Sequence, residues 1–92
     1  MIMVEDGDKF LIRFSREVSF LNKAKLVDYL ERVPDNSAVL IDPLRCEFMD
    51  RDIIDTVNDF IETSQARGIR VYIMRDNRKE ELFRDPFKLE MK

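Results

Sequence analysis

The chain has 92 residues, a net charge of −3 and a sequence pI near 5.0. A chain of this length forms one small domain, and its acidic balance argues against nucleic-acid binding, which usually needs a basic face. The absence of histidine removes the commonest general base and metal ligand, so we expect a non-catalytic protein without a cofactor.

The chain carries one cysteine, Cys46, which cannot form an internal disulfide. This fits a reducing, cytosolic environment. No apolar stretch approaches the ~20 residues that cross a bilayer, and the N-terminus lacks a basic region followed by an apolar one. We therefore expect this chain by itself to be soluble.

Residues 2–15 predict an antiparallel hairpin with strands at 2–4 and 9–14. Between these strands, Gly7 supplies the positive φ that such a turn often needs. Phe10, Ile12 and Phe14 recur at every second position, which predicts that they share one face of the second strand.

Residues 19–33 predict an amphipathic helix. Ser19 is the expected N-cap, because its hydroxyl can accept from a free N–H of the first turn. Pro34 ends the helix by removing a donor. The expected inward stripe consists of Phe20, Ala24, Val27 and Leu30.

Residues 50–66 predict the longest helix, between apolar strands at 38–41 and 69–74. Continuous apolar runs favour central strands that are covered on both faces. Gly68 lies where a left-handed C-terminal cap belongs, and Ile69 follows it to pack back on the helix. The expected inward stripe of this helix is Ile53, Ile54, Val57, Phe60, Ile61 and Ser64.

A shorter helix at 78–84, capped by Asp76 or Asn77, and a tail after Pro86 complete the pattern. The order β-β-α-β-α-β-α predicts a small α/β fold. Its mixed sheet has about four strands, with the first as an antiparallel edge and helices packed on the sheet. Without a linker or repeat, residues 1–92 form a single domain, with a core at about 9–75 and a short helix and tail at 76–92.

Three aspartates stand close together in "RCEFMDRDIIDTVNDF", at Asp50, Asp52 and Asp55. Hard oxygen ligands at this spacing suggest a divalent metal site, and with it a metal-dependent enzyme. However, the stretch has neither the turn glycine nor the final glutamate of a calcium loop. The aspartates also begin a helix, where carboxylates accept free N–H groups and oppose the positive end of the dipole. We favour this structural interpretation.

An acidic stripe, made of Asp52, Asp55, Asp59 and Glu62, follows one face of the same helix. Like charges at these spacings repel each other weakly. The stripe is interpreted first as a solvated face, and as an alternative it predicts a docking surface for a basic partner.

Cysteine and glycine positions argue against two further kinds of site. Glu47 and Asp50 disfavour a thiolate at Cys46, which therefore predicts a structural thiol. Neither Gly7 nor Gly68 opens a helix after a strand, which excludes the usual phosphate-binding loops.

Basic residues gather late in the chain. We interpret them as solvated positions, and the alternative is contact with anionic headgroups or with an acidic partner. They are Arg67, Arg70, Arg75, Arg78 and Lys79.

Two segments, "VLIDPLRCEFMDRDIIDTVNDF" and "ARGIRVYIM", resemble the STAS domain of sulfate transporters and anti-sigma-factor antagonists. The resemblance runs from about Phe10 to Met74. In that family a central strand ends in aspartate, and a loop leads through phenylalanine, a hydrophobic residue and aspartate into a helix. The corresponding positions here are Asp42, Phe48, Met49 and Asp50.

Anti-sigma-factor antagonists typically continue as Asp-Ser-Ser-Gly, and their second serine is phosphorylated. Here the stretch is Asp50, Arg51, Asp52, Ile53, so Asp52 stands at the phosphoacceptor position. The resemblance thus implies a fixed negative charge, weaker than the ~ −1.5 to −2 of phosphoserine, and no kinase-driven switch at this position.

Two features resemble the C-terminal STAS domains of bacterial SulP transporters. One is the pattern of aspartate, any residue, aspartate at this helix start. The other is the segment "VSFLNKAKL" at 18–26, which is similar to the start of the first helix in those domains. This resemblance implies a non-catalytic, regulatory protein-interaction domain on the cytoplasmic face of the inner membrane, within a sulfate- or bicarbonate-class transporter. The alternative is a free-standing signalling protein, similar to an anti-sigma-factor antagonist but without the phosphorylatable serine.

The partners that the resemblance implies are the transmembrane domain of the same transporter, a cytosolic protein and a second copy of the chain, with no nucleic acid. We expect the contact surface around the position of the family's switch. Its residues are Asp42, Arg45, Glu47, Asp50, Arg51, Asp52 and Asp55.

Overall fold

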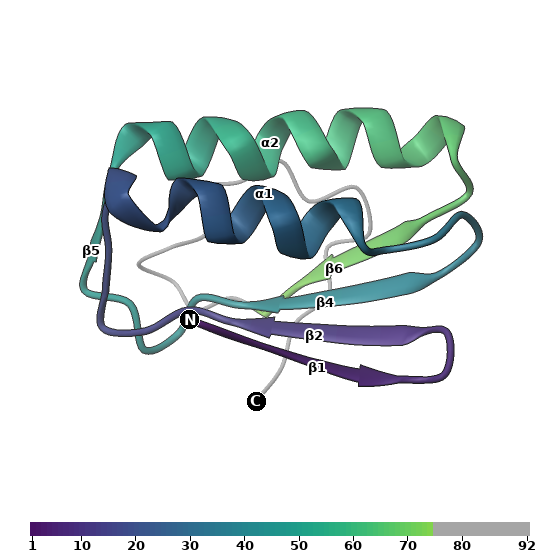
Figure 1. The fold of residues 1–92 in the computed structure, drawn as a ribbon, viewed down its shortest axis with the longest axis horizontal. Coiled ribbons are helices and arrows are strands. Elements are labelled where there is room, and N and C mark those ends of the chain that lie inside the picture. The colour runs from purple at the N-terminus through teal and green to yellow at the C-terminus, as the bar shows by residue number, and fades with distance from the viewer. Residues whose placement is uncertain (75–92) are drawn as a thin grey trace.

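The computed structural model describes residues 1–74. Figure 1 shows a four-stranded sheet with two helices on one of its faces. The predicted small α/β fold with a mixed sheet is confirmed, while the helix expected at 78–84 and the tail lie outside the described residues. The elements are β1 (Ile2–Asp6), β2 (Lys9–Arg13), β3 (Glu17–Val18), η1 (Phe20–Asn22), α1 (Lys23–Glu31), β4 (Ala38–Asp42), β5 (Phe48–Met49), α2 (Arg51–Ala66) and β6 (Arg70–Ile73).

The main sheet has the strand order β1-β2-β4-β6, which is also the order of these strands in the chain. As predicted, β1 is an antiparallel edge strand, and β2, β4 and β6 run parallel. Both parallel connections move in the same direction across the sheet. Because such connections are right-handed, α1 and α2 lie on the same face (Figure 1).

The core lies between this face and the helices. Phe10, Ile12 and Phe14 are buried, as their alternation predicts. The expectation that strands 38–41 and 69–74 are covered on both faces is wrong within residues 1–74. Leu40 and Tyr72 are only half-buried, because they point away from the face on which both helices lie. The remaining buried strand residues are Val18, Val39, Ile41, Val71 and Ile73.

The first helix begins later than its pattern predicts. Residues 20–22 form a 3-10 turn that Ser19 caps, accepting from the N–H of Leu21 at 3.2 Å. Phe20 is 63% exposed and Ala24 is also exposed, whereas Leu26 and Leu30 face the core and Val27 is half-buried. The core face follows Leu26 and Leu30, which are four residues apart, and Phe20 and Ala24 lie off that face.

The second helix follows its prediction closely. All six residues of its expected inward stripe are buried. At its end, Gly68 has φ of 69° and donates its N–H to the carbonyl of Gln65 at 3.3 Å. The N–H of Ile69 reaches back to the carbonyl of Ser64 at 3.0 Å, which completes a Schellman cap. Neither this helix nor the first one in residues 1–74 is long and apolar enough to span a membrane.

Candidate functional site

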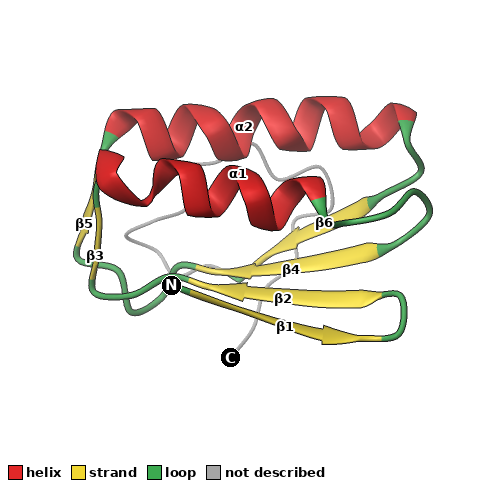
Figure 2. Cartoon of the chain, viewed as in Figure 1, coloured by secondary structure: helices red, strands yellow, loops and turns green. Residues whose placement is uncertain are grey.

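Two short strands that the sequence pattern does not reveal bring the starts of both helices together. β3 and β5 pair in parallel, Glu17 with Phe48 and Val18 with Met49, and form a second sheet at one end of the molecule (Figure 2). The N–H of Asp50 donates to the carbonyl of Val18 at 3.0 Å and extends this pairing. Two-residue strands are too short for hydrophobic periodicity to indicate them.

The sequence predicts that the side chain of Asp50 caps its own helix, but the structure shows no such hydrogen bond. Asp50 occupies the N-cap position of α2 with an extended backbone (φ −62°, ψ 148°). Instead, its Oδ2 accepts from the N–H of Phe20 at 2.5 Å. The carboxylate therefore satisfies a free donor at the start of the other helix, because the β3–β5 pairing places the two ends side by side.

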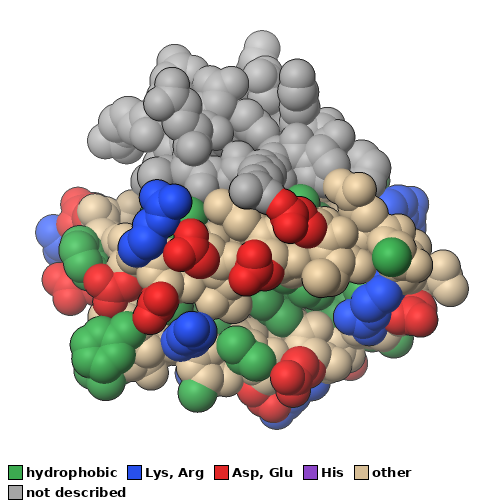
Figure 3. Space-filling view, turned by 90° about the horizontal axis from the view of Figure 1, so that it is seen from above, with side chains coloured by type: hydrophobic (Ala, Val, Ile, Leu, Met, Phe, Trp, Pro, Cys, Tyr) green, Lys and Arg blue, Asp and Glu red, His purple; other side chains and the backbone are tan. Residues whose placement is uncertain are grey.

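Asp52 and Asp55 lie on the exposed outer face of α2, together with Asp59 and Glu62, as the acidic stripe predicts. Asp52 is the acidic residue of the first turn, where it opposes the helix dipole. Asp55 pairs with Arg51, whose Nε lies 3.2 Å from its Oδ1. Figure 3 shows acidic side chains spread over the helix side of the molecule.

The three aspartates of the cluster therefore make different interactions. Asp50 accepts a hydrogen bond from the start of the first helical segment, Asp52 opposes the dipole of α2, and Asp55 pairs with an arginine. Within residues 1–74, no three Asp, Glu or Cys side chains are placed to hold a metal ion together. Helix-end electrostatics accounts for this arrangement without a ligand.

Asp42 is the one expected contact residue that lies inside the protein. It is 4% exposed. Its Oδ2 accepts from the Nε of Arg13 at 2.8 Å, and its Oδ1 accepts from the N–H of Leu44 at 3.0 Å. Both oxygens hold the end of β4 and the following loop, so this carboxylate does not belong to the exposed surface.

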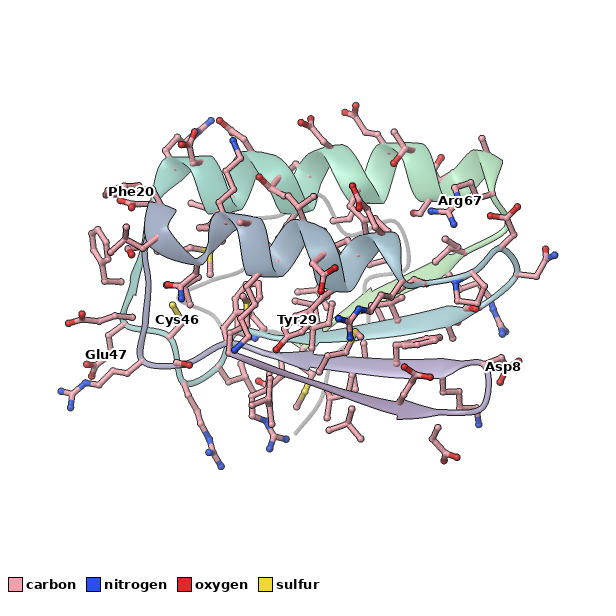
Figure 4. The ribbon with its side chains drawn as sticks, viewed as in Figure 1. Asp8, Phe20, Tyr29, Cys46, Glu47 and Arg67 are labelled. Carbon is pink, nitrogen blue, oxygen red and sulfur yellow. The ribbon has the colours of Figure 1, made fainter. Side chains whose placement is uncertain are left out.

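The rest of the loop is divided between core and surface. Cys46 is buried, and its Sγ–H donates to the carbonyl of Phe48 at 3.0 Å, in agreement with a structural thiol. Arg45 is exposed, and Glu47 forms an exposed ion pair with Arg16. Figure 4 shows Cys46 and Glu47 at the same end of the molecule as Phe20.

Three large apolar side chains on this end lie at the surface, and one of them, Phe20, was expected to face the core. Phe20 is 63% exposed, Leu21 78% and Phe48 53%. Counting back from the buried Leu26 and Leu30 by helical steps would have shown that Phe20 and Leu21 lie off the core face. Exposure of adjacent apolar side chains is typical of a contact site.

We call this end of the molecule the helix-start surface. A hollow of about 330 Å³ lies on it, lined by Phe20, Asp50, Arg51 and Asp52. Apolar side chains with charged residues around them suit the binding of a protein segment. The surface comprises Phe20, Leu21, Arg45, Glu47, Phe48, Asp50, Arg51, Asp52 and Asp55.

Of the basic residues late in the chain, the structure describes Arg67, which is half-buried, and Arg70, which is exposed. Arg67 donates to Asp35 at 2.7 Å and to the carbonyl of Val33 at 2.7 Å, which holds the end of α2 at the far end of the molecule (Figure 4). The remaining three, Arg75, Arg78 and Lys79, lie outside the described residues.

Comparisons with known proteins support the fold. No protein-family model and no curated protein matches the sequence. One solved structure, "Crystal Structure Analysis of Mglu", is similar with a TM-score of 0.68 and 18% sequence identity. The match covers 84% of this chain and 20% of that chain, so the present chain spans about a fifth of its length. At this identity the likeness shows a shared small α/β fold and nothing about activity.

Proposed function

We propose that this chain is a regulatory, protein-interacting STAS domain of a SulP-type inorganic anion transporter, without catalysis of its own. The observation that carries the proposal is the placement of Asp52. Its carboxylate is exposed on the first turn of α2, beside the exposed ring of Phe20. In the anti-sigma-factor antagonists that the sequence also resembles, this helix position carries the phosphorylated switch, whereas the SulP domains carry aspartate, any residue, aspartate at this helix start.

The chemistry of the helix-start surface supports binding. Glu47, Asp50, Asp52 and Asp55 give it an excess of negative charge, although Arg45, Arg51 and the neighbouring Arg16 offset most of it. The exposed Phe20, Leu21 and Phe48 add apolar area that is removed from water when a partner covers it. We infer that the partner presents an apolar side chain with basic neighbours.

The reading frame that contains this chain tests the transporter part of the proposal. Roughly ten or more apolar spans of ~20 residues, in frame upstream of Met1, support a SulP transporter. A frame with no such spans contradicts this and favours the free-standing signalling protein.

The role of the surface is tested in the protein encoded by that frame. We expect Asp52→Lys to lower uptake of labelled sulfate or bicarbonate, or the amount of protein that reaches the membrane, by about threefold or more. Asp59→Lys is the matched control, because it reverses a charge on the same helix face two turns away. Equal behaviour of the two variants and the wild type would show that the surface is misassigned.

A further inference from the structure

The face of the main sheet opposite the helices carries a row of apolar side chains. The strand pairings align Val4 with Leu11, Leu11 with Leu40, and Leu40 with Tyr72, so the row crosses all four strands. Val4 is 51% exposed and the other three are half-buried. A contiguous apolar row on a sheet face is typical of a surface that binds another layer of protein.

A second row lies beside it and carries charge. Asp6, Lys9, Ala38 and Arg70 are aligned by the same pairings. Both rows line one open hollow of about 420 Å³. We call these eight residues the open sheet face.

The charges of this second row are available to a partner. Asp6, Lys9 and Arg70 are exposed. No ion pair within residues 1–74 includes any of the three, although Lys9 is the cross-strand neighbour of Asp6. Unpaired charges at the edges of an apolar row give a contact its orientation.

We propose that the open sheet face binds a second copy of this chain, sheet against sheet, with the two-fold axis parallel to the strands. Rotation about this axis places each row over the same row of the other copy. It also reverses the strand order, so that β1 lies over β6 of the other copy and β2 lies over its β4. Asp6 then faces Arg70 of the other copy, and Arg70 faces Asp6, which gives two equivalent ion pairs. Lys9 faces the small Ala38, which leaves room for its side chain.

The apolar row matches itself under the same operation. Leu11 faces Leu40 of the other copy, and Val4 faces Tyr72, so each contact pairs apolar side chains. An axis running across the strands would instead place Lys9 against Arg13 of the other copy, since both lie on β2 on either side of the apolar row. Like charges at this point disfavour that alternative.

The size of the face predicts a weak dimer. Four strands about 4.8 Å apart, with at most five residues each at ~3.3 Å per residue, span at most about 19 by 17 Å. Specific interfaces with ~800 Å² per partner are larger, so we expect association in the micromolar range or weaker. This inference concerns a different surface from the helix-start surface and does not depend on the proposed function.

The experiment is sedimentation velocity of the full 92-residue chain from about 5 μM to about 1 mM, a range suited to weak interfaces. The wild type is expected to shift with concentration from the 11.0 kDa monomer toward twice that mass. Asp6→Arg and Arg70→Asp should each weaken association about tenfold, because each places like charges against each other. The double variant D6R/R70D should return to within about threefold of the wild type, because the pairs are restored with exchanged partners.

Asp8→Arg is the matched control. It reverses a charge in the turn two residues away, at a position that does not line the hollow, and should leave association unchanged. A wild type that stays monomeric at every concentration would overturn the proposal. So would a double variant that associates no better than the single variants, or a control that weakens association as much as Asp6→Arg.

Discussion

The carboxylate of Asp50 accepts a hydrogen bond from the backbone N–H of Phe20, 2.5 Å away and 30 residues earlier in the chain. Each of these residues stands at the start of a different helix. The contact satisfies one of the free donors at the beginning of the first helical segment. One side chain therefore links the starts of both helices, and the helix-start surface is built around this link.

Replacing Asp50 with alanine removes this link. We expect Asp50→Ala to lower the free energy of unfolding by about 1 kcal/mol, the usual cost of losing a side-chain acceptor at a helix start. Urea denaturation followed by circular dichroism measures this change. Asp59→Ala, which removes a charge from an exposed position on the same helix, is the control, and equal losses would contradict the role of the Phe20 contact.

Gly68 has a backbone conformation and surroundings that both resist a side chain. Its φ is 69°, and a Cβ at this position would clash with Oδ1 at the end of the Asn36 side chain, which would have to move. We expect Gly68→Ala to destabilise the fold by about 1–2 kcal/mol. Gly7→Ala is the control, because Gly7 has φ of 63° but no atom within 4 Å of the added Cβ, so it reports the backbone cost alone.

Asn36 offers a separate test of the crowding at Gly68. This asparagine itself has φ of 64°, so Asn36→Gly should be neutral or stabilising by a few tenths of a kcal/mol. In this background Gly68→Ala should cost less than in the wild type, because the obstructing side chain is gone. Thermal melts of the four proteins in this double-mutant cycle measure the coupling, and strict additivity would show that the clash has no energetic role.

Two ion pairs in the same region differ in burial and should differ in energy. We expect Asp42→Ala to cost about 2 kcal/mol, because it leaves Arg13 and the N–H of Leu44 without their acceptor. Glu47→Ala breaks the pair with Arg16, whose side chains are 64% and 79% exposed, and should cost less than about 0.5 kcal/mol. Guanidinium denaturation of both variants measures the difference, and the reverse order would contradict the assignment of Asp42 to the interior.

Two phenylalanines test the position of the first helix. Phe20 is 63% exposed, whereas Phe14 is fully buried. Phe20→Ala should change the free energy of unfolding by no more than about 0.5 kcal/mol, and Phe14→Ala should lower it by about 3–5 kcal/mol. A large loss of stability in Phe20→Ala would show that its ring packs in the core, as the helical pattern alone predicts.

The features that the sequence predicts correctly are those with a local physical signal. The stripe from Ile53 to Ser64 follows from helical spacing, and the cap at Gly68 follows from the need for a positive φ. The side-chain contact between Asp50 and Phe20 depends on the pairing of β3 with β5, which joins segments far apart in the chain. No local pattern carries that information, so the surface around them emerges only in three dimensions.

The agreement between strand order and chain order has a consequence for how the domain is assembled. Within residues 1–74, every new strand of the main sheet is added at the outer edge of the main-sheet strand before it, and none has to be inserted between two neighbours. A growing chain can therefore complete the hairpin, then dock α1 with β4, then α2 with β6, as each unit leaves the ribosome. Because each stage ends with an open edge at the newest strand, the unfinished sheet is exposed to edge-to-edge association until the next strand is added.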